Sequence, residues 1–278
     1  MADEPKLVLP AERRFHAFCI GTAKSGTHSI ASMFNKFYKS AHEPDSHFMV
    51  GVILRKAMGL FSQRELSLFV KKRDERLQLE MEASNLNYYV LDDLLREFPE
   101  AKHVLTIRDC YSWLASAINH HLNGLKDAEH WHLYRDLRYK APDVKYAPQE
   151  KVLKEMGVHP LEGYLIYWAA HNSRVLELVP KEKLLIIRTD EISNSAEKMA
   201  AFFGIPVGTL DTKQSHEFQA PRKFAVLSKI DPDFLEEKFT QSCRKLMDAY
   251  FPEFPSYKEW RAKKKEGKEK KQLEAAAN

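Results

Sequence analysis

Short apolar runs alternate along the chain with stretches whose apolar residues recur at helical spacing. The run at 15–20 predicts a strand, and the runs at 103–107 and 184–188 are continuous, as is typical of strands buried in a parallel sheet. After the first run, apolar residues return at i, i+3, i+4 and i+7, at Ile30, Met33, Phe34 and Phe37. The chain therefore begins with a predicted strand, a turn and an amphipathic helix.

The same patterns assign most of the remaining chain. One strand is expected to end near 40–44, where Pro44 stops it, and a short strand is expected at 88–91. Helices are expected three times within 46–84 (the third around 77–81), at 94–98, from 112 onward, at 161–179, before Gly204 and at 234–250. The stretch 123–160 shows no clear period and is interpreted as a helical or looped lid. The alternation predicts an α/β fold with a mainly parallel central sheet flanked by helices.

Composition and charge limit the classes of function. Of the 278 residues, 44% are hydrophobic, which is enough for a core, and 1–260 fits one large domain. The net charge is +4, and the seven Lys/Arg and three Glu from Arg261 onward account for all of it. A neutral body argues against a nucleic-acid partner. The end, 261–278, is interpreted as a flexible lysine-rich tail.

The cysteines and the absence of long apolar runs indicate where the protein works. Cys19, Cys110 and Cys243 are scattered without CxxC spacing, which predicts buried thiols in a reducing compartment. Residues 1–14 contain no apolar leader, and no run of 18 apolar residues occurs. We therefore expect a cytoplasmic protein without membrane contact. The sequence does not indicate an oligomeric state.

The turn after the first strand carries the clearest chemistry. It has the sequence Gly-Thr-Ala-Lys-Ser-Gly-Thr-His-Ser at 21–29 and opens a helix. Backbone N–H groups and the helix dipole at such a turn favour a negative charge. Lys24 adds a positive charge, and Ser25, Thr27 and Ser29 add hydroxyl donors. The turn is a predicted cradle for a phosphate-like group, although an ordinary strand–helix turn remains an alternative.

The turn differs from the nucleotide P-loop in one respect. Gly21 and Gly26 have the P-loop spacing, but Thr27 stands where the P-loop lysine belongs, and the lysine lies inside the loop at Lys24. This arrangement resembles the 5′-phosphosulfate loop of the sulfotransferase family, often Pro-Lys-Ser-Gly-Thr-Thr. Here Ala23 replaces the proline and His28 the second threonine. The resemblance implies a P-loop-like sulfotransferase architecture.

A second stretch resembles the other signature of that family. Arg108 follows the strand at 103–107, and Ser116 stands eight residues later on the next predicted helix. In sulfotransferases, residues at this spacing hold the 3′-phosphate of 3′-phosphoadenosine 5′-phosphosulfate, which the resemblance therefore implies as sulfuryl donor. A late Arg-Lys-Gly element also closes over this phosphate in cytosolic members. Arg222 and Lys223 resemble that element, but Phe224 replaces the glycine.

The resemblance also implies a mechanism. The family moves a sulfuryl group to a hydroxyl or an amine, with charge stabilisation by Lys24 and a base that takes the acceptor proton. Glu43 matches the glutamate of tyrosylprotein and some bacterial members, and His47 and His120 are reserve candidates because cytosolic members use a histidine. No metal is expected, since a sulfuryl group carries less charge than a phosphoryl group. A chain without an anchor favours a small-molecule acceptor.

Two other functions remain open from the sequence. The chain could be a P-loop kinase or NTPase, with Asp92 as an acid after the strand at 88–91, but the lysine after Gly26 is missing. It could also be a non-catalytic module that binds a nucleotide on the same fold. Magnesium-dependent ATP hydrolysis would favour the first, and nucleotide binding without turnover would favour the second.

Overall fold

The computed structural model describes residues 12–124, 128–140, 144–212 and 222–276. Backbone contacts divide the chain into two compact units. The described part of the first unit is 12–108, 128–134 and 171–212, and that of the second is 109–124, 135–140, 144–170 and 222–276. Two helices contribute residues to both units, α6 (Glu129–Tyr139) and α8 (Leu161–Leu178).

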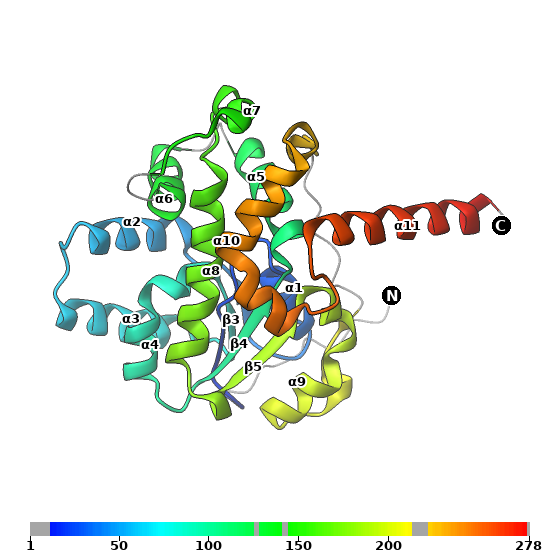
Figure 1. The fold of residues 1–278 in the computed structure, drawn as a ribbon. Helices are drawn as coiled ribbons and strands as arrows, with labels where there is room; N and C mark the ends of the chain where they lie inside the picture. The colour runs from blue at the N-terminus through cyan, green and yellow to red at the C-terminus, as the bar shows by residue number, and fades with distance from the viewer. Residues whose placement is uncertain (1–11, 125–127, 141–143, 213–221, 277–278) are drawn as a thin grey trace, which may run out of the picture. The chain divides into compact units, whose positions relative to one another are not determined.

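The first unit is built on a five-stranded sheet with the order β2-β3-β1-β4-β5, in which every pair is parallel. Its strands are β1 (Ala17–Cys19), β2 (Ser40–His42), β3 (Met81–Ala83), β4 (Lys102–Ile107) and β5 (Leu184–Arg188). Figure 1 labels three of these strands, β3, β4 and β5. The strands predicted at 15–20, 40–44, 103–107 and 184–188 are confirmed, and so is the parallel sheet flanked by helices.

The strand order reverses direction between β1 and β4. After β1 the chain runs toward the edge of the sheet formed by β2, and after β4 it runs toward the opposite edge, formed by β5. Strands β1 and β4 pair directly, with Cys19 opposite Val104. Open α/β sheets bind ligands outside the carboxyl ends of their strands at such a switch point. The loop after β1 and the residues after β4 are therefore the first place to look for a site.

Helices cover both faces of this sheet because its strands are apolar on both faces. Ala17 and Cys19 of β1 pack on one side with α1 (Thr27–Phe34) and α9 (Ala196–Phe203). Phe18, between them, points to the other side, where α2 (Ser46–Ala57), α3 (Gln63–Leu77) and α4 (Leu91–Glu97) pack. The short 3₁₀ segments of this unit are η1 (Asn85–Val90), η3 (Lys181–Lys183), η4 (Thr189–Asn194) and η5 (Val207–Thr209).

Two sequence predictions are wrong. No third helix lies within 46–84. Helix α3 ends at Leu77, the next residue Gln78 has a left-handed φ of 50°, and Met81–Ala83 then form the strand between β2 and β1. The segment predicted as a strand at 88–91 is instead η1 and the start of α4, and the Ser84 hydroxyl caps η1 by accepting from Leu86 N. A three-residue strand has too short a pattern to be distinguished from a helix end.

The second unit is helical in its described part. It contains α5 (Cys110–Asn123), η2 (Pro148–Glu150), α7 (Lys151–Glu155), η7 (Val226–Lys229), α10 (Pro232–Tyr250) and α11 (Tyr257–Ala276). Tyr111 joins three of these helices, with its ring centroid 4.7 Å from that of Phe239 and 5.5 Å from that of Tyr257. Beyond this contact, residues 261–266 of α11 are exposed.

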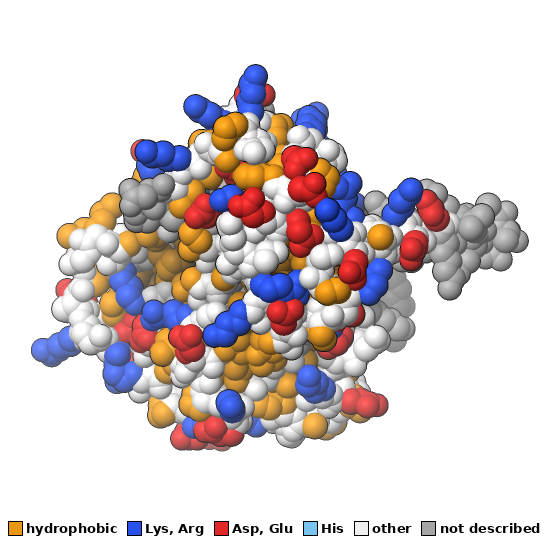
Figure 2. Space-filling model, in the orientation of Figure 1, with side chains coloured by type: hydrophobic (Ala, Val, Ile, Leu, Met, Phe, Trp, Pro, Cys, Tyr) orange, Lys and Arg blue, Asp and Glu red, His pale blue; other side chains and the backbone are white. Residues whose placement is uncertain are grey.

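Two surface properties of the described residues bear on partners. None of the helices in the described ranges has both the length and the hydropathy of a bilayer-spanning segment. Lysine and arginine side chains are interspersed with aspartate and glutamate over the face shown in Figure 2.

Candidate active site

The loop after β1 lies flat against β4 because Gly21 has no side chain. A Cβ at Gly21 would stand 2.0 Å from Thr106 Oγ1 and 2.6 Å from Thr106 O, closer than atoms can approach. The adjacent Ile20 N donates to Val104 O at 2.9 Å, so the strand pairing continues up to the glycine. A side chain at this position would push the loop off the sheet.

Ser25 anchors the loop from within. Its side chain is fully buried, and its hydroxyl donates to Thr22 O at 2.6 Å and bonds Thr106 Oγ1 at 2.8 Å. From the other side, the Thr189 hydroxyl donates to the backbone oxygen of Ser25. The hydroxyl that the sequence predicted as a ligand donor is thus engaged in shaping the loop. The sequence did not indicate Thr106 or Thr189, which lie far away along the chain.

Helix α1 starts directly after the loop. Gly26 has a φ of +107°, and a Cβ there would lie 2.3 Å from Ile192 Cδ1, so this position requires glycine. The first helical bond runs from Ile30 N to Gly26 O, which leaves the N–H groups of residues 26–29 at the helix N-terminus. These groups and the helix dipole favour an anion. The Thr27 hydroxyl lies 3.1 Å from His42 Nε2.

Two cationic side chains meet at this loop. Lys24, half-buried with a left-handed φ of 70°, follows β1, and Arg108 follows β4; the Arg108 Nη1 donates to Lys24 O at 3.1 Å. Burial lowers the pKa of Lys24, the Arg108 charge lowers it further, and Glu43 raises it. An anion placed here would relieve the repulsion between the two cations.

The end of β2 brings an acid to the same place. Glu43 has a left-handed φ of 47°, and its backbone N donates to Ala83 O at 3.0 Å, so the turn is tied to β3. Its Oε1 lies 3.8 Å from His42 Nε2. Burial lowers the pKa of His42 to about 4, with smaller contributions from His28 and Lys24, so His42 is neutral at physiological pH.

Asn85 completes this cluster, although no pattern in the sequence indicated it. It is the first residue of η1 after β3, it is 4% exposed, and its Nδ2 donates to Glu43 Oε1. Its place beside Glu43 follows from the pairing of β2 with β3, because both residues lie just beyond the carboxyl ends of these strands. His42, which precedes Glu43, could have been noticed as a polar residue at the end of a predicted strand.

The remaining base candidates, His47 and His120, lie on helices α2 and α5. His47 is exposed in the first turn of α2, with Nδ1 3.0 Å from His130 Nε2 and its ring 5.5 Å from that of Trp131. His120 is exposed near the end of α5 in the second unit. The charge of the third candidate, Glu43, raises the pKa of Lys24.

The second unit groups the other predicted phosphate ligands around α5. Ser116, Asn119 and Asn123 share one face of this helix, at i, i+3 and i+7. Asn119 Oδ1 accepts from Phe224 N at 2.7 Å, and Asn123 Nδ2 donates to Arg222 O at 3.1 Å. Two asparagines therefore hold the backbone around exposed Lys223 on the helix face that carries Ser116.

Comparison with known proteins decides the family. The model of a family described as sulfotransferase domain matches residues 16–216, well over half of the chain. The chain belongs to this sulfotransferase family. It is a transferase, as the sequence predicted. A search of curated proteins returned no significant match.

Solved structures similar to this sulfotransferase include three bacterial ones. A sulfotransferase from Alicyclobacillus acidocaldarius has 18% identity and a TM-score of 0.48, covering 84% of this chain and 95% of that one. Sulfotransferase STF9 from Mycobacterium avium has 13% identity and a TM-score of 0.48, covering 87% of this chain and 78% of that one. The sulfotransferase domain of the Synechococcus PCC 7002 olefin synthase has 14% identity and a TM-score of 0.37, covering 83% of this chain and 86% of that one.

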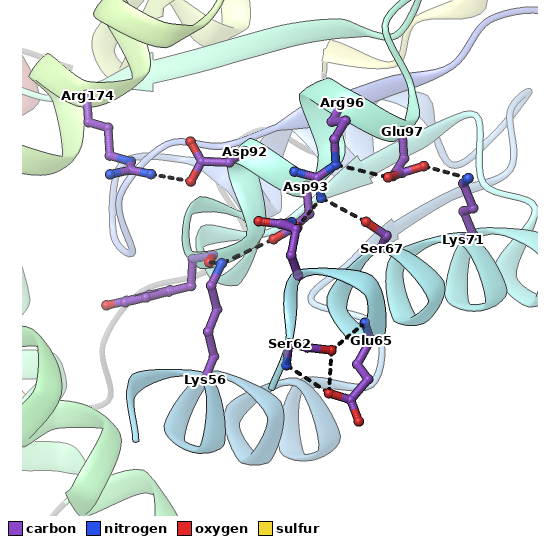
Figure 3. A network of polar contacts seen from close by, with 12 residues as sticks. Lys56, Ser62, Glu65, Ser67, Lys71, Asp92, Asp93, Arg96, Glu97 and Arg174 are labelled. Atoms are coloured by element: carbon purple, nitrogen blue, oxygen red, sulfur yellow. Dashed lines mark hydrogen bonds and ion pairs between the residues drawn. The ribbon is translucent and has the colours of Figure 1, made fainter. Parts of the chain in front are cut away.

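The acid that a kinase or NTPase would need has another role in this sulfotransferase. Asp92 does not follow a strand; it lies in the first turn of α4 and pairs with Arg174 (Figure 3). Its neighbour Asp93 is held by Lys56 at 3.1 Å and by Arg96. These ion pairs join α2, α4 and α8 within the first unit. Among the described residues, no group of three His, Cys, Asp or Glu could hold a metal ion.

Proposed function

We propose that this sulfotransferase moves a sulfuryl group from 3′-phosphoadenosine 5′-phosphosulfate to a hydroxyl or amine of a small molecule. The observation that carries the proposal is the meeting of Lys24, Arg108 and Glu43 at the sheet's switch point, beside the N-terminus of α1. The three buried cysteines fit a reducing compartment, so we propose the cytoplasm as its location.

The phosphates of the donor require positive groups, and the chain offers them in two sets. Lys24 and the N–H groups of residues 26–29 suit the 5′-phosphosulfate, and Ser25 shapes the loop that presents them. We assign Ala23 to the same phosphosulfate loop, as the resemblance implies. For the 3′-phosphate we propose Arg108, whose guanidinium fork suits a phosphate dianion. To Ser116, Arg222 and Lys223 we assign the same phosphate, as the resemblance implies.

The proposed reaction is an in-line displacement. A bond forms between the acceptor oxygen or nitrogen and sulfur, while the bond between sulfur and the 5′-phosphate oxygen breaks. The acceptor proton goes to the Glu43 carboxylate, and adenosine 3′,5′-bisphosphate leaves. Lys24 and the α1 amides stabilise the negative charge that builds on the leaving phosphate. Positioning and charge stabilisation thus supply the catalysis, as in phosphoryl transfer.

A transfer assay tests this function. The protein is incubated with ³⁵S-labelled donor and a panel of phenols, alcohols, sugars and amines. We expect label in at least one acceptor with the wild-type protein and almost none with Glu43→Gln. Tight binding of adenosine 3′,5′-bisphosphate without transfer to any acceptor would identify a non-catalytic module instead.

A further inference from the structure

Glu43 is connected to helix α6 by a buried chain of hydrogen bonds. Asn85 Nδ2 donates to Glu43 Oε1, and the Tyr134 hydroxyl donates to Asn85 Oδ1 at 3.0 Å. Asn85 is 4% exposed and Tyr134 is 1% exposed, so water has little access to either link. All three residues belong to the first unit.

The fold holds both Asn85 and Tyr134 in place. The Ser84 hydroxyl caps the 3₁₀ turn that Asn85 begins, accepting from Leu86 N at 3.1 Å. The Tyr134 ring packs edge-on against Tyr89, with centroids 5.5 Å apart, and against Trp131 at 6.0 Å. Neither link can rotate away without disturbing the core on this face of the sheet, to which Tyr134 belongs.

The direction of donation along these hydrogen bonds follows from the chemistry of the groups involved. An asparagine amide has an oxygen that accepts and a nitrogen that donates. With Tyr134 donating to Oδ1, the Asn85 nitrogen faces the Glu43 carboxylate; the flipped amide would place two acceptors against each other. The acceptor-only carboxylate of Glu43 therefore selects this orientation of Asn85, and the Tyr134 hydroxyl supports it by donating to Oδ1.

We propose that Asn85 and Tyr134 are positioning residues for the Glu43 base. This inference rests on the proposed role of Glu43 in sulfuryl transfer. Donation from Asn85 fixes the rotamer of the carboxylate and favours its charged form, which is the form that can take a proton from the acceptor. Tyr134 lies on α6, within the stretch 123–160 for which the sequence predicted a helical or looped lid. The position of Tyr134 on α6 therefore affects how readily Glu43 ionises.

Besides Tyr134, which reaches it through Asn85, two ionisable groups lie near the carboxylate and are held constant in the test. His42 Nε2 lies 3.8 Å from Glu43 Oε1, and Lys24 interacts with Glu43 through its charge. The test variants change Asn85 or Tyr134 and leave His42 and Lys24 in place.

The first experiment reads the protonation of Glu43 without any turnover. Carboxyl ¹³C-labelled glutamate is titrated by NMR, and Glu43→Gln assigns the resonance. We expect Asn85→Leu to raise the titration midpoint by about one pH unit, because a hydrogen bond to a charged group is lost. Tyr134→Phe, which keeps the ring, shifts it less in the same direction. An unchanged midpoint in both variants overturns the inference.

Asn87→Leu is the matched control. Asn87 is also asparagine, lies on the same 3₁₀ turn and is 1% exposed, and its Nδ2 has no hydrogen-bond partner among the described residues. The midpoint of Glu43 in this variant should equal that of the wild-type protein. A shift as large as that of Asn85→Leu would mean that the midpoint reports a general loosening of η1, and the specific role of Asn85 would be wrong.

The second experiment separates this inference from the proposed function. With an acceptor found, Tyr134→Phe and Asn85→Leu should lower kcat about tenfold. KM for the donor should not change, and the acidic limb of the pH–rate profile should move to higher pH. Wild-type kcat and profile in both variants overturn the positioning role alone. If the wild-type protein transfers no sulfuryl group, the proposed function fails, and the NMR titration still decides whether Asn85 and Tyr134 control Glu43.

Discussion

The Arg108 guanidinium donates a hydrogen bond to the backbone oxygen of Lys24 at 3.1 Å across 84 residues of sequence. The contact exists because β1 and β4 are neighbours in the sheet, so the residues that follow them meet at one edge. Arg108 thus binds the main chain of the loop, and the Lys24 ammonium is a separate cation beside it. The two side chains can therefore be tested one at a time.

Lys24→Ala should remove catalysis and leave the fold intact. The loop conformation depends on Gly21, Ser25 and Gly26, and Arg108 bonds the backbone of Lys24, which alanine retains. We expect kcat to fall at least about 100-fold, as when a group that stabilises transition-state charge is removed. The melting temperature should change little. Steady-state kinetics and calorimetry check both; wild-type turnover would contradict the role of Lys24.

Gly21→Ala should disrupt the loop by steric overlap. Its Cβ would lie 2.0 Å from Thr106 Oγ1, and overpacking of this kind costs about 1–3 kcal/mol. We expect a lower free energy of unfolding in urea and weaker binding of adenosine 3′,5′-bisphosphate.

The control for this loop variant is Gly51→Ala within α2, where an added Cβ meets nothing within 4 Å. Alanine is the better helix former, so this variant should gain about 0.5–1 kcal/mol. If both variants are equally stable, Gly21 does not lie against Thr106 as described.

Glu43→Gln should separate binding from chemistry. Glutamine keeps the size of the side chain but cannot take the acceptor proton, so kcat should fall about 100- to 10,000-fold. The affinity for adenosine 3′,5′-bisphosphate should remain close to that of the wild-type protein. Glu191→Gln, on an exposed carboxylate beside Arg188, is the control. Full activity of Glu43→Gln would place the base at another residue.

Buried His103 should make the fold sensitive to acid. Burial, with a smaller contribution from nearby His16, lowers its pKa from the ordinary 6.5 to about 4. The unfolded chain therefore takes up this proton first, and stability is lost as the pH falls from about 6.5 toward 4. At pH 5 this loss is about 2 kcal/mol.

His103→Leu should remove that part of the pH dependence. Urea unfolding at pH 7 and pH 5 gives the comparison. The loss between the two pH values should be about 2 kcal/mol smaller in the variant, whatever its stability at pH 7. An equal loss in both proteins would show that His103 takes up its proton as easily in the folded state as in the unfolded chain.

The sequence predicted those features that depend on local pattern. The loop at 21–29, its flanking strand and helix, and the strand before Arg108 all have patterns long enough to read. Strand β3 could not be predicted because it has only three residues and a charged residue, Glu82, in its middle. The buried Arg73 that compensates this charge, 2.7 Å away, is brought there by the fold. Asn85 could not be predicted as a neighbour of Glu43 either, since its position depends on that strand.

The central claim is that a nucleotide with two separated phosphates binds through Lys24 and Arg108. Isothermal titration calorimetry with adenosine 3′,5′-bisphosphate tests it most directly, on the wild-type protein, Lys24→Ala and Arg108→Ala. We predict measurable binding to the wild-type protein and at least about tenfold weaker binding to each variant, since each loses a charge-assisted contact. Equal affinity in all three proteins, or none in the wild-type protein, would contradict the account.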